Sequence, residues 1–274
     1  MARRWLVTGC SSGLGAALAE AVAAAGDTLL ATARKPATLD DLAAAHPDRV
    51  TVAALDIRDP GQCAEAVRIA EERLGGIDVL VNNAATGLLG AVEEVSDEEL
   101  REQLEVLAVA PWRLARLVLP GMRQRRGGHI VNVSSIAGRL SFPGMGAYVA
   151  GKHALEGMSQ ALAAEVEPFG IRVTVLEPGG FSTRYGSSAA EAATRIPAYR
   201  GAAVDQTRDG VRGMAHNPDL GRPEDFAALV LRLVAAADGP LRVPVGADAY
   251  QYLEAARTRA GTELATAEAF TRGG

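Results

Sequence analysis

Short apolar runs rich in β-branched residues alternate along the chain with longer alanine- and leucine-rich segments of helical period. This alternation is typical of βαβ units, in which a helix connects one strand to a parallel neighbour. The runs predict strands near residues 5–8, 28–32, 50–55, 78–81, 129–133, 172–176 and 241–245. Helices are expected to begin near residues 13, 38, 61, 97, 145 and 222, and a last amphipathic helix is expected over 248–268. The pattern predicts an α/β fold: a Rossmann-type, doubly wound parallel sheet of about seven strands with helices on both faces.

One segment breaks this alternation. Residues 180–221 are rich in Gly, Ser, Arg and Pro and have weak periodicity. The segment is too long for an ordinary connection, and it follows the end of a strand, where open α/β sheets bind ligands. We expect a substrate-binding loop region here; the alternative is an insertion without a role. Because no linker-like stretch divides the rest, residues 1–274 are expected to form one domain.

Composition and charge narrow the class of protein. Hydrophobic residues make up 48% of the 274 residues, enough for a large core, and the net charge is −5. A negative chain is poorly suited to non-specific binding of nucleic acid, which needs clustered positive charge. Arg123, Arg125 and Arg126 form the densest basic run, but they lie where a helix is expected to end and would interact with its dipole.

Cysteine and histidine usage predicts neither a disulfide framework nor a metal site. The two cysteines, Cys10 and Cys63, form no paired motif. The four histidines lack partners at metal-ligand spacing: His46, His129, His153 and His216. The first strand follows the N-terminus too closely for a signal peptide, and no apolar run reaches membrane-spanning length. We therefore expect a cytoplasmic protein that binds neither nucleic acid nor membrane.

A glycine-rich turn lies between the first predicted strand and the first predicted helix. It reads Thr8-Gly9-Cys10-Ser11-Ser12-Gly13-Leu14-Gly15. Glycines permit a tight turn and a close approach of the backbone to a pyrophosphate, and the helix N-terminus supplies free N–H groups and a favourable dipole. This position makes a dinucleotide site the favoured interpretation over a glycine-rich turn without a ligand.

The residues at the end of the second predicted strand indicate which dinucleotide the chain binds. An NAD site would place Asp or Glu here to bind the ribose 2′-hydroxyl, whereas this chain has Arg34 and Lys35. Both side chains suit a 2′-phosphate, so NADP(H) is the predicted cofactor, the alternative being a solvated basic pair. Asp56, after the third strand, is expected to contact the adenine, and the amide pair Asn82-Asn83 ends the fourth strand.

A serine, a tyrosine and a lysine form the candidate reactive group. Ser135 follows the fifth predicted strand, and Tyr148 and Lys152 are four residues apart, which places them on one face of a helix. A free tyrosine has a pKa near 10, and a nearby ammonium together with an oxidised nicotinamide would lower it. Tyr148 is then expected to exchange a proton with a carbonyl or an alcohol, whose oxygen Ser135 holds.

The rarity of lysine in this chain supports a role for Lys152. Lys and Arg number 28 in the chain, yet only Lys35 and Lys152 are lysines. A chain so rich in arginine that keeps a lysine next to Tyr148 indicates a need for a compact ammonium. A chance surface pair is the alternative, and the glycine-rich turn and Ser135 argue against it.

These motifs together resemble the short-chain dehydrogenase/reductases over roughly the first 185 residues. The motifs that match, in order, are Thr8 with Gly13 and Gly15, Asp56, Asn82-Asn83-Ala84, Ser135, Tyr148 with Lys152, and Pro178-Gly179 with Thr183. The resemblance implies that Lys152 also binds the nicotinamide ribose, and that Pro178, Gly179 and Thr183 hold the carboxamide end. Ile57 and Phe181 complete the predicted cofactor site. It also implies a homodimer or homotetramer assembled through the helices that begin near residues 97 and 145.

One departure from the family pattern concerns the proton path. The family carries an asparagine, the fourth member of its catalytic group, at the position of Leu107, in a segment leading into a helix expected to end at 120–122. That asparagine holds a water that links the lysine to solvent. Leucine cannot form hydrogen bonds, so this relay is rerouted, slowed or absent here. A second change, Ala85 in place of the family's glycine, is small.

Three functions remain open on the sequence. The leading one is an NADPH-dependent carbonyl reductase for a medium-sized apolar ketone, and the stretch 148–183 looks closest to members that act on ketones or hydroxysteroid-like alcohols. The predicted substrate contacts are Phe142, Met145, Tyr185 and Tyr199. The second is an isomerase, dehydratase or cyclase that reuses Tyr148 and Lys152, motivated by Leu107. The third is a non-catalytic NADP(H)-binding protein, against which the intact Ser135, Tyr148 and Lys152 argue.

Overall fold

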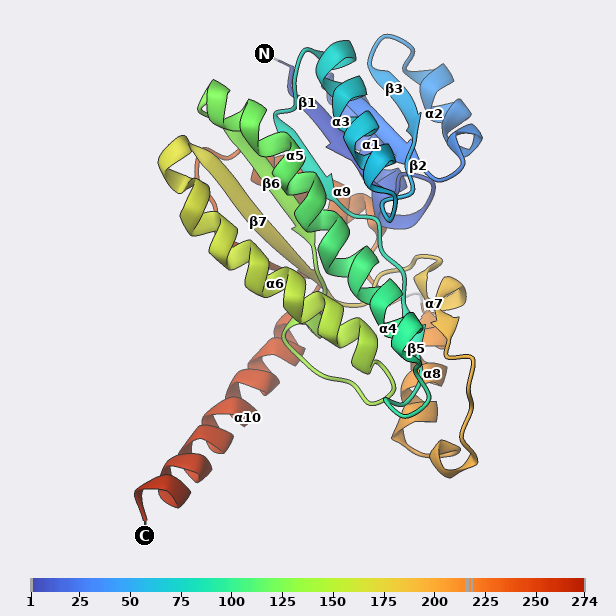
Figure 1. Cartoon of the computed structure of the whole chain (residues 1–274), viewed down its shortest axis with the longest axis vertical. Coiled ribbons are helices and arrows are strands. Elements are labelled where there is room, and N and C mark those ends of the chain that lie inside the picture. The colour runs from blue at the N-terminus through green and yellow to red at the C-terminus, as the bar shows by residue number, and fades with distance from the viewer. Residues whose placement is uncertain (1, 215–216, 218, 274) are drawn as a thin grey trace.

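The computed structural model describes residues 2–214, 217 and 219–273 and is built on one parallel sheet of seven strands (Figure 1). The strand order is β3-β2-β1-β4-β6-β7-β9. The strands are β1 (Arg4–Val7), β2 (Thr28–Ala33), β3 (Val50–Ala54), β4 (Val79–Asn82), β6 (Gly128–Val133), β7 (Ile171–Pro178) and β9 (Arg242–Val245). The order reverses between β1 and β4, which is the topological switch point where such sheets bind ligands.

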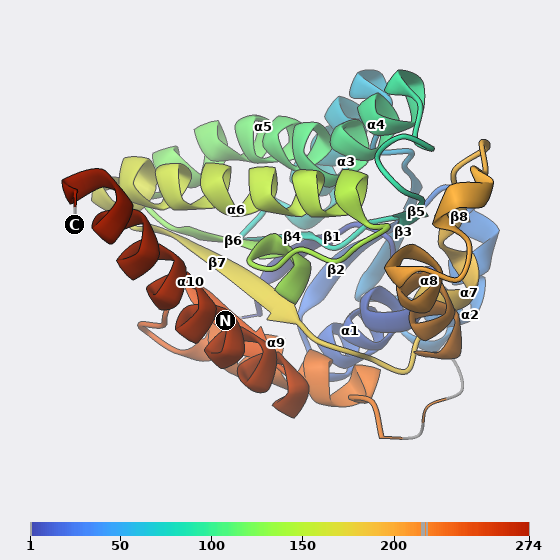
Figure 2. The ribbon, with the colours of Figure 1, turned by 90° about the horizontal axis from the view of Figure 1, so that it is seen from below.

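Helices cover both faces of the sheet (Figure 2). One face carries α3 (Pro60–Leu74), α4 (Asp97–Leu104), α5 (Ala110–Arg125) and α6 (Gly146–Val166), and the other carries α1 (Gly13–Ala24) and α9 (Pro223–Ala235). The short helix α2 (Asp40–Ala45) lies beside the edge strand β3. The remaining turns are η1 (Pro36–Leu39), η3 (Ile136–Gly138) and η4 (Glu167–Phe169). These layers confirm the predicted fold class.

A separate apolar core fills each side of the sheet. Leu6, Leu80 and Ile130 point toward α3, α5 and α6, while Trp5 and Val81 point toward α1 and α9. Successive residues of a strand point to opposite faces, and both faces are buried, so the strands are apolar at almost every position. This is why the runs in the sequence are continuous rather than alternating.

Two expectations about helices need correction. The helix end expected at the basic run 123–126 is confirmed, because α5 ends at Arg125, whereas the end expected at 120–122 is wrong. The helix continues through Pro120 because Val118 and Met122 are buried and hold it against the core despite the missing proline N–H. Ahead of it, residues expected as plain helix form a π-helical turn, η2 (Glu105–Val109), that contains Leu107. The inserted residue of a π turn locally shifts the register of side chains along a helix.

The segment expected as a loop, residues 180–221, has more regular structure than its sequence indicated. It contains α7 (Tyr185–Ser188), β8 (Ala190–Glu191), η5 (Pro197–Tyr199) and α8 (Ala203–Gly213). Strand β8 pairs with β5 (Leu88–Leu89) in a small second sheet, and this pairing joins the segment to the connection after β4. The helical period of α8 was hidden by the glycines and arginines around it.

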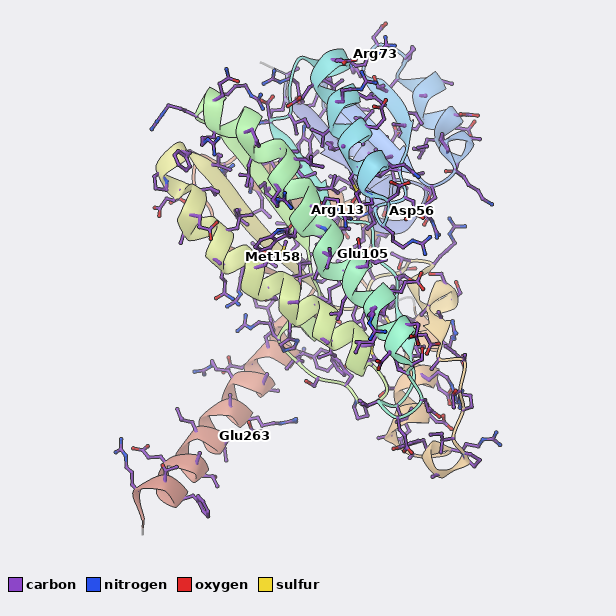
Figure 3. The ribbon with its side chains drawn as sticks, viewed as in Figure 1. Asp56, Arg73, Glu105, Arg113, Met158 and Glu263 are labelled. Carbon is purple, nitrogen blue, oxygen red and sulfur yellow. The ribbon has the colours of Figure 1, made fainter. Side chains whose placement is uncertain are left out.

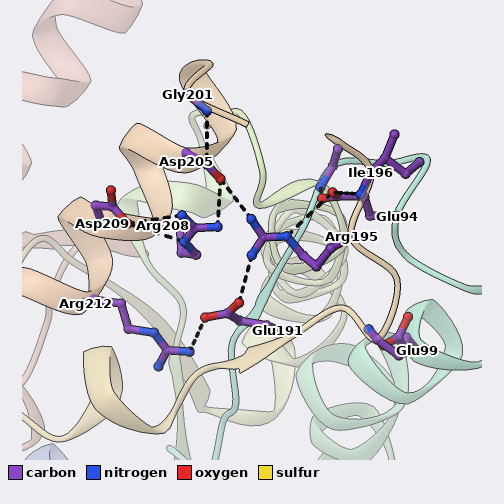
Figure 4. A network of polar contacts seen from close by, with 12 residues as sticks. Glu94, Glu99, Glu191, Arg195, Ile196, Gly201, Asp205, Arg208, Asp209 and Arg212 are labelled. Atoms are coloured by element: carbon purple, nitrogen blue, oxygen red, sulfur yellow. Dashed lines mark hydrogen bonds and ion pairs between the residues drawn. The ribbon is translucent and has the colours of Figure 1, made fainter. Parts of the chain in front are cut away.

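A cluster of ion pairs holds the same segment in place (Figure 4). The guanidinium of Arg195 lies 3.0 Å from Glu191 and 3.1 Å from Asp205, and Arg212 contacts Glu191 from the other side at 3.0 Å. The buried carboxylate of Glu94 accepts a hydrogen bond from the backbone N–H of Ile196. Several charges in a network constrain a segment better than isolated surface pairs do.

The last helix, α10 (Ala247–Arg272), leaves the domain (Figures 1 and 2). An amphipathic helix over 248–268 was expected, and the helix forms, but Ala249 is its only buried member among the described residues. Its later side chains, such as the labelled Glu263 in Figure 3, stand clear of the rest of the chain. Within the described ranges, none of the helices combines the length and apolar character needed to cross a membrane.

Candidate active site

A cavity of about 940 Å³ lies along the carboxyl ends of the strands, between the sheet and the segment that contains α7 and α8. Its volume is in the range of pockets for large organic ligands. It brings together most of the predicted site residues. These are Gly9, Ser11, Ser12, Gly13, Leu14, Gly15, Arg34, Asp56, Ile57, Asn83, Ala84, Ser135, Phe142, Met145, Tyr148, Lys152, Pro178, Gly179, Phe181, Thr183 and Tyr185.

Close contacts between backbone segments shape the glycine-rich end. Gly9 has a φ of +75°, and a Cβ on Gly15 would lie 2.2 Å from the Gly9 carbonyl oxygen, so neither position tolerates a side chain without movement. The Asn83 amide donates to the Thr8 carbonyl at 2.9 Å, and the Thr8 hydroxyl accepts from the backbone N–H groups of Asn83 and Ala84 at 3.0 Å. Asn83 therefore braces the turn from the neighbouring strand.

The helix that follows the turn presents its N-terminus to the cavity. Ser12 occupies the N-cap position of α1 without a capping hydrogen bond from its side chain, and the first turn holds no acidic residue. The N–H groups of the first turn are therefore available to a ligand, and the helix dipole favours an anion there. This arrangement fits a pyrophosphate.

Two arginines lie at the end of the cavity near Asp56. Arg34 lines the cavity, and the guanidinium of Arg58 donates to the Asp56 carboxylate, with 2.6 Å between Nη2 and Oδ2. This hydrogen bond holds the pKa of Asp56 below its usual range. Sequence reasoning missed Arg58, although its spacing of two residues from Asp56 after a strand was visible.

A second ion pair, next to Asp56, stabilises the side of the cavity formed by η2 and the connection after β3 (Figure 3). Arg113 of α5 lies 2.7 Å from Glu105 of η2 and also donates to the Ile57 carbonyl at 3.0 Å. These contacts fix η2 against the connection that follows β3.

Two predicted residues do not reach the cavity. Lys35 lies outside its lining, where the chain turns into η1. Tyr199 is also outside, because its hydroxyl donates to the Glu93 carboxylate at 2.8 Å and turns the ring away. Of the predicted basic pair Arg34 lines the site, and of the predicted substrate contacts Phe142, Met145 and Tyr185 line it.

A buried lysine lies at the reacting end of the cavity. The Lys152 side chain is 2% exposed, and its ammonium donates to the Val133 carbonyl oxygen at 2.8 Å. Burial lowers the pKa of Lys152 to about 8, and the charge of Glu156 acts in the opposite direction. The ammonium lies 5.7 Å from the centre of the Tyr148 ring.

Tyr148 and Ser135 complete this end. Burial raises the pKa of the Tyr148 phenol, while the neighbouring hydroxyl groups of Tyr185 and Ser135 act in the opposite direction. The Ser135 hydroxyl accepts the backbone N–H of Ala137 at 3.1 Å, which leaves its own proton available to another acceptor. The protein without cofactor therefore holds Tyr148 as a neutral phenol, a proton donor, at neutral pH.

Buried amides fix the helix that carries Tyr148 and Lys152. Asn82 donates to Asn132 at 2.8 Å, Asn132 donates to the Ser159 hydroxyl at 2.8 Å, and Ser159 donates to a carbonyl of α6. The relay runs from β4 through β6 to α6. Each of these polar groups would be costly to bury alone, so the relay favours one position of α6 on the sheet.

Leu107 of η2 is buried against the helix that carries Lys152. It is 1% exposed, and a Cβ on Gly151 would lie 2.8 Å from the Leu107 Cβ, so the leucine packs directly on the backbone of α6. An apolar side chain therefore packs against Gly151, the residue that precedes Lys152 on α6.

The opposite side of the reacting end is largely apolar. Phe142 and Met145 line it, and Tyr252 of α10 meets Phe142 edge to face with 6.3 Å between ring centres. The Tyr185 ring lies 5.7 Å from that of Tyr148, and its buried hydroxyl has no hydrogen-bond partner in the part of the chain that the structure describes. Tyr252 was missed because α10 is distant in sequence.

The described ranges contain no group of three or more His, Cys, Asp or Glu side chains that could hold a metal ion. His46, His129 and His153 lie apart from the cavity lining, and His216 lies outside the described residues. Cys10 and Cys63 are buried free thiols.

Comparisons of sequence and of structure with known proteins point to the same family. The family model for short chain dehydrogenases matches residues 3–194. The chain is 39% identical to oxidoreductase BOA17 of Botryotinia fuckeliana over 253 residues, or 92% of each chain. A short-chain dehydrogenase structure from Streptomyces avermitilis is 43% identical with a TM-score of 0.92, covering 99% of this chain and 98% of that one. An alcohol dehydrogenase from the archaeon Thermococcus sibiricus, complexed with 5-hydroxy-NADP, is 25% identical with a TM-score of 0.73, covering 90% and 97%. Other similar structures hold NADP or NADH.

The packing of the glycine-rich turn gives a direct prediction. Gly15→Ala is expected to lower the free energy of unfolding by about 1–3 kcal/mol, because its Cβ must push α1 away from Gly9. Gly157→Ala in α6 is the matched control: its Cβ meets open space, and the change should stabilise by about 0.5–1 kcal/mol. Urea unfolding measures both, and two variants of equal stability would contradict the packing.

Proposed function

This chain belongs to the short-chain dehydrogenase family, and on that premise we propose that it is an NADP(H)-dependent oxidoreductase that interconverts a ketone and a secondary alcohol. One observation carries the proposal. Ser135, Tyr148 and Lys152 line one end of the same cavity whose other end is the glycine-rich turn and Arg34. A dinucleotide held along this cavity brings its reactive end to the tyrosine.

The residues present fit such a cofactor. Gly9 and Gly15 let the backbone come close to a pyrophosphate, the N-terminus of α1 favours its charge, and Asp56 lies where an adenine would end. Pro178, Gly179 and Thr183 line the cavity at the end of β7, where the carboxamide would be held. When bound, the nicotinamide supplies or accepts the hydride.

The protein's own part in the reaction is proton transfer and orientation. In the reducing direction Tyr148 donates its phenolic proton to the carbonyl oxygen as the carbonyl carbon is reduced, and the product is the alcohol. Ser135 donates a hydrogen bond to the same oxygen and holds it toward Tyr148. The charge of Lys152 stabilises the phenolate that remains, and a proton from solvent restores the phenol.

The preference for NADP(H) over NAD(H) rests on Arg34. Its guanidinium lines the cavity beyond the end of β2, where no acidic residue is present to bind a ribose 2′-hydroxyl. A planar guanidinium can form two parallel hydrogen bonds to a phosphate. The pair formed by Asp56 and Arg58 leaves Arg34 as the cation for that group.

The substrate side favours a medium-sized apolar ketone. Phe142, Met145 and Tyr252 offer aromatic and thioether surface, and Tyr185 adds one hydroxyl close to Tyr148. We propose the region 180–221 as the substrate-binding segment, because α7 and part of α8 line the cavity there. A cytoplasmic location and a homodimeric or homotetrameric assembly stay predictions.

Leu107 favours one second candidate. Because an apolar side chain packs on α6 beside Lys152, the return of a proton to Tyr148 from that side is blocked. An enzyme that returns its proton to the product, such as an isomerase, dehydratase or cyclase, does not need that path. Such an enzyme would convert substrate with no net consumption of NADPH.

The cofactor preference predicts a difference between two neighbouring cations. Arg34→Ala is expected to weaken NADPH binding about 10- to 100-fold, because a charge-assisted contact to the 2′-phosphate is lost, and to change NADH binding little. Lys35→Ala, outside the cavity lining, serves as the control and should leave both affinities close to native. Calorimetric titration measures the four affinities. Equal losses for NADPH and NADH, or a larger loss in Lys35→Ala, would contradict the assignment.

The reaction itself is tested by following NADPH absorbance with a panel of ketones, diketones and aldehydes, using native protein and Leu107→Asn. We expect the native protein to oxidise NADPH with at least one ketone. The variant should turn over about tenfold faster, because an amide beside Lys152 offers a polar path for protons. It should also be less stable by about 1–3 kcal/mol, because the amide is buried.

Either reaction class has its own signature in this assay. Turnover by native protein supports the reductase. Binding of NADPH with turnover only in Leu107→Asn would contradict the reductase and favour the non-redox candidate, which is then sought by product analysis without NADPH consumption.

A further inference from the structure

The charge of Lys152 is buried with little direct compensation. The side chain is 2% exposed, and within the described ranges its ammonium donates a hydrogen bond to a neutral acceptor, the Val133 carbonyl. An ammonium taken out of water loses its proton unless an opposite charge lies close by. The reaction proposed above needs that proton, so the source of compensation matters.

The elements around Lys152 offer few acidic groups. Leu107 of η2 packs on the neighbouring Gly151, Val133 of β6 offers its carbonyl, and Tyr148 on the preceding turn of α6 is a neutral phenol. On the following turn of α6 lies Glu156, four residues after the lysine on the same face and 3% exposed. Its carboxylate is the acidic group that acts on Lys152.

Glu156 is itself contacted by an arginine of the edge strand, β9. Arg242 of β9 lies 3.0 Å from one Glu156 oxygen and 3.7 Å from Glu177 of β7, and Arg139 after η3 lies 3.1 Å from Glu177. Arg242 and Arg139 are partly exposed, so solvent screens their charges, whereas both carboxylates are buried. Arg242 therefore engages one Glu156 oxygen from the partly exposed side, while Arg139 engages Glu177 instead.

The inner oxygen of Glu156 has no partner of its own. Its Oε1 is buried without a hydrogen bond within the described part of the chain, and so are Ser134 Oγ and Glu177 Oε2. Glu156 Oε1 and Ser134 Oγ both lie next to the bare Cα of Gly138, within 3.1 Å and 2.5 Å of the place where a Cβ would stand. A carboxylate buried with one oxygen free is costly, which indicates a role beyond packing.

We propose that Glu156 is a positioning residue whose buried carboxylate is the counter-ion that keeps Lys152 charged, and that Arg242 shares this carboxylate from the partly exposed side. The inference rests on the proposed function in one respect only: the charge of Lys152 is taken to support Tyr148 in the reaction. The direction of the pKa shifts agrees: burial lowers the pKa of Lys152 to about 8 and Glu156 opposes the fall. Burial first, and then the charge of Glu156, raise the pKa of Glu177.

The composition of the chain makes a direct test possible. Lys35 and Lys152 are its only lysines, so protein labelled with ¹³C at lysine Cε gives two NMR signals, one of them from an exposed reference. Titrating these signals without cofactor or substrate measures the pKa of Lys152 itself. In Glu156→Gln the pKa of Lys152 is expected to fall by about one unit, because loss of the carboxylate disfavours the charged form, while that of Lys35 stays unchanged.

Two further variants keep the test decisive. Glu65→Gln removes an exposed carboxylate that pairs with Arg68, and it should leave the pKa of Lys152 unchanged. Arg242→Gln removes the cation that shares the Glu156 carboxylate and keeps Glu156, so the pKa of Lys152 should rise. This variant tests the counter-ion proposal if Glu156→Gln fails to fold. A pKa of Lys152 that stays native in the folded Glu156→Gln protein, falls equally in Glu65→Gln, or falls in Arg242→Gln would overturn the proposal.

The pH dependence of turnover separates this inference from the proposed function. If both hold, the basic limb of kcat/KM for ketone reduction moves to lower pH in Glu156→Gln by the same amount as the NMR pKa, because reduction needs the protonated pair. An NMR shift without a shift of the limb would support the counter-ion and contradict the role given to Lys152 in the reaction.

Discussion

The hydrogen bond from the Lys152 ammonium to the Val133 carbonyl, 2.8 Å long, is the contact on which the candidate site depends. It ties α6 to the last residue of β6, two positions before Ser135. Tyr148, one turn earlier on the same helix face, is thereby brought to the serine. The bond also draws the ammonium out of water, and this burial makes its charge sensitive to every neighbouring group.

The surroundings of that bond divide into a polar and an apolar half. The relay from Asn82 through Asn132 to Ser159 and the carboxylate of Glu156 lie on the sheet side, and each is held in a defined place. The apolar half consists of Leu107, which packs on Gly151 of α6, and Phe142, which lines the same end of the cavity. In such a low-dielectric site, proton transfer depends on a few fixed charges rather than on bulk solvent.

Much of this arrangement was predictable from sequence, because it follows from position along βαβ units. The glycine-rich turn, Asp56, Ser135 and the Tyr148–Lys152 pair each lie at a strand end or on one helix face, and parallel strands bring their carboxyl ends to one edge. Contacts between segments far apart in sequence were not predictable. Arg58, Tyr252 and the Arg242–Glu156 pair depend on packing that no local pattern records, and Tyr199 was misplaced because Glu93 binds its hydroxyl.

The role of Tyr148 as proton donor is best tested by comparing native protein with Tyr148→Phe, first for NADPH affinity and then for ketone reduction. We expect the variant to bind NADPH with native affinity, because the phenol ring is kept. Its kcat/KM should fall by about 10²- to 10⁴-fold, because the proton donor is lost. Native turnover in Tyr148→Phe, with folding and NADPH binding intact, would show that Tyr148 is not the proton donor and place that donor elsewhere in the cavity.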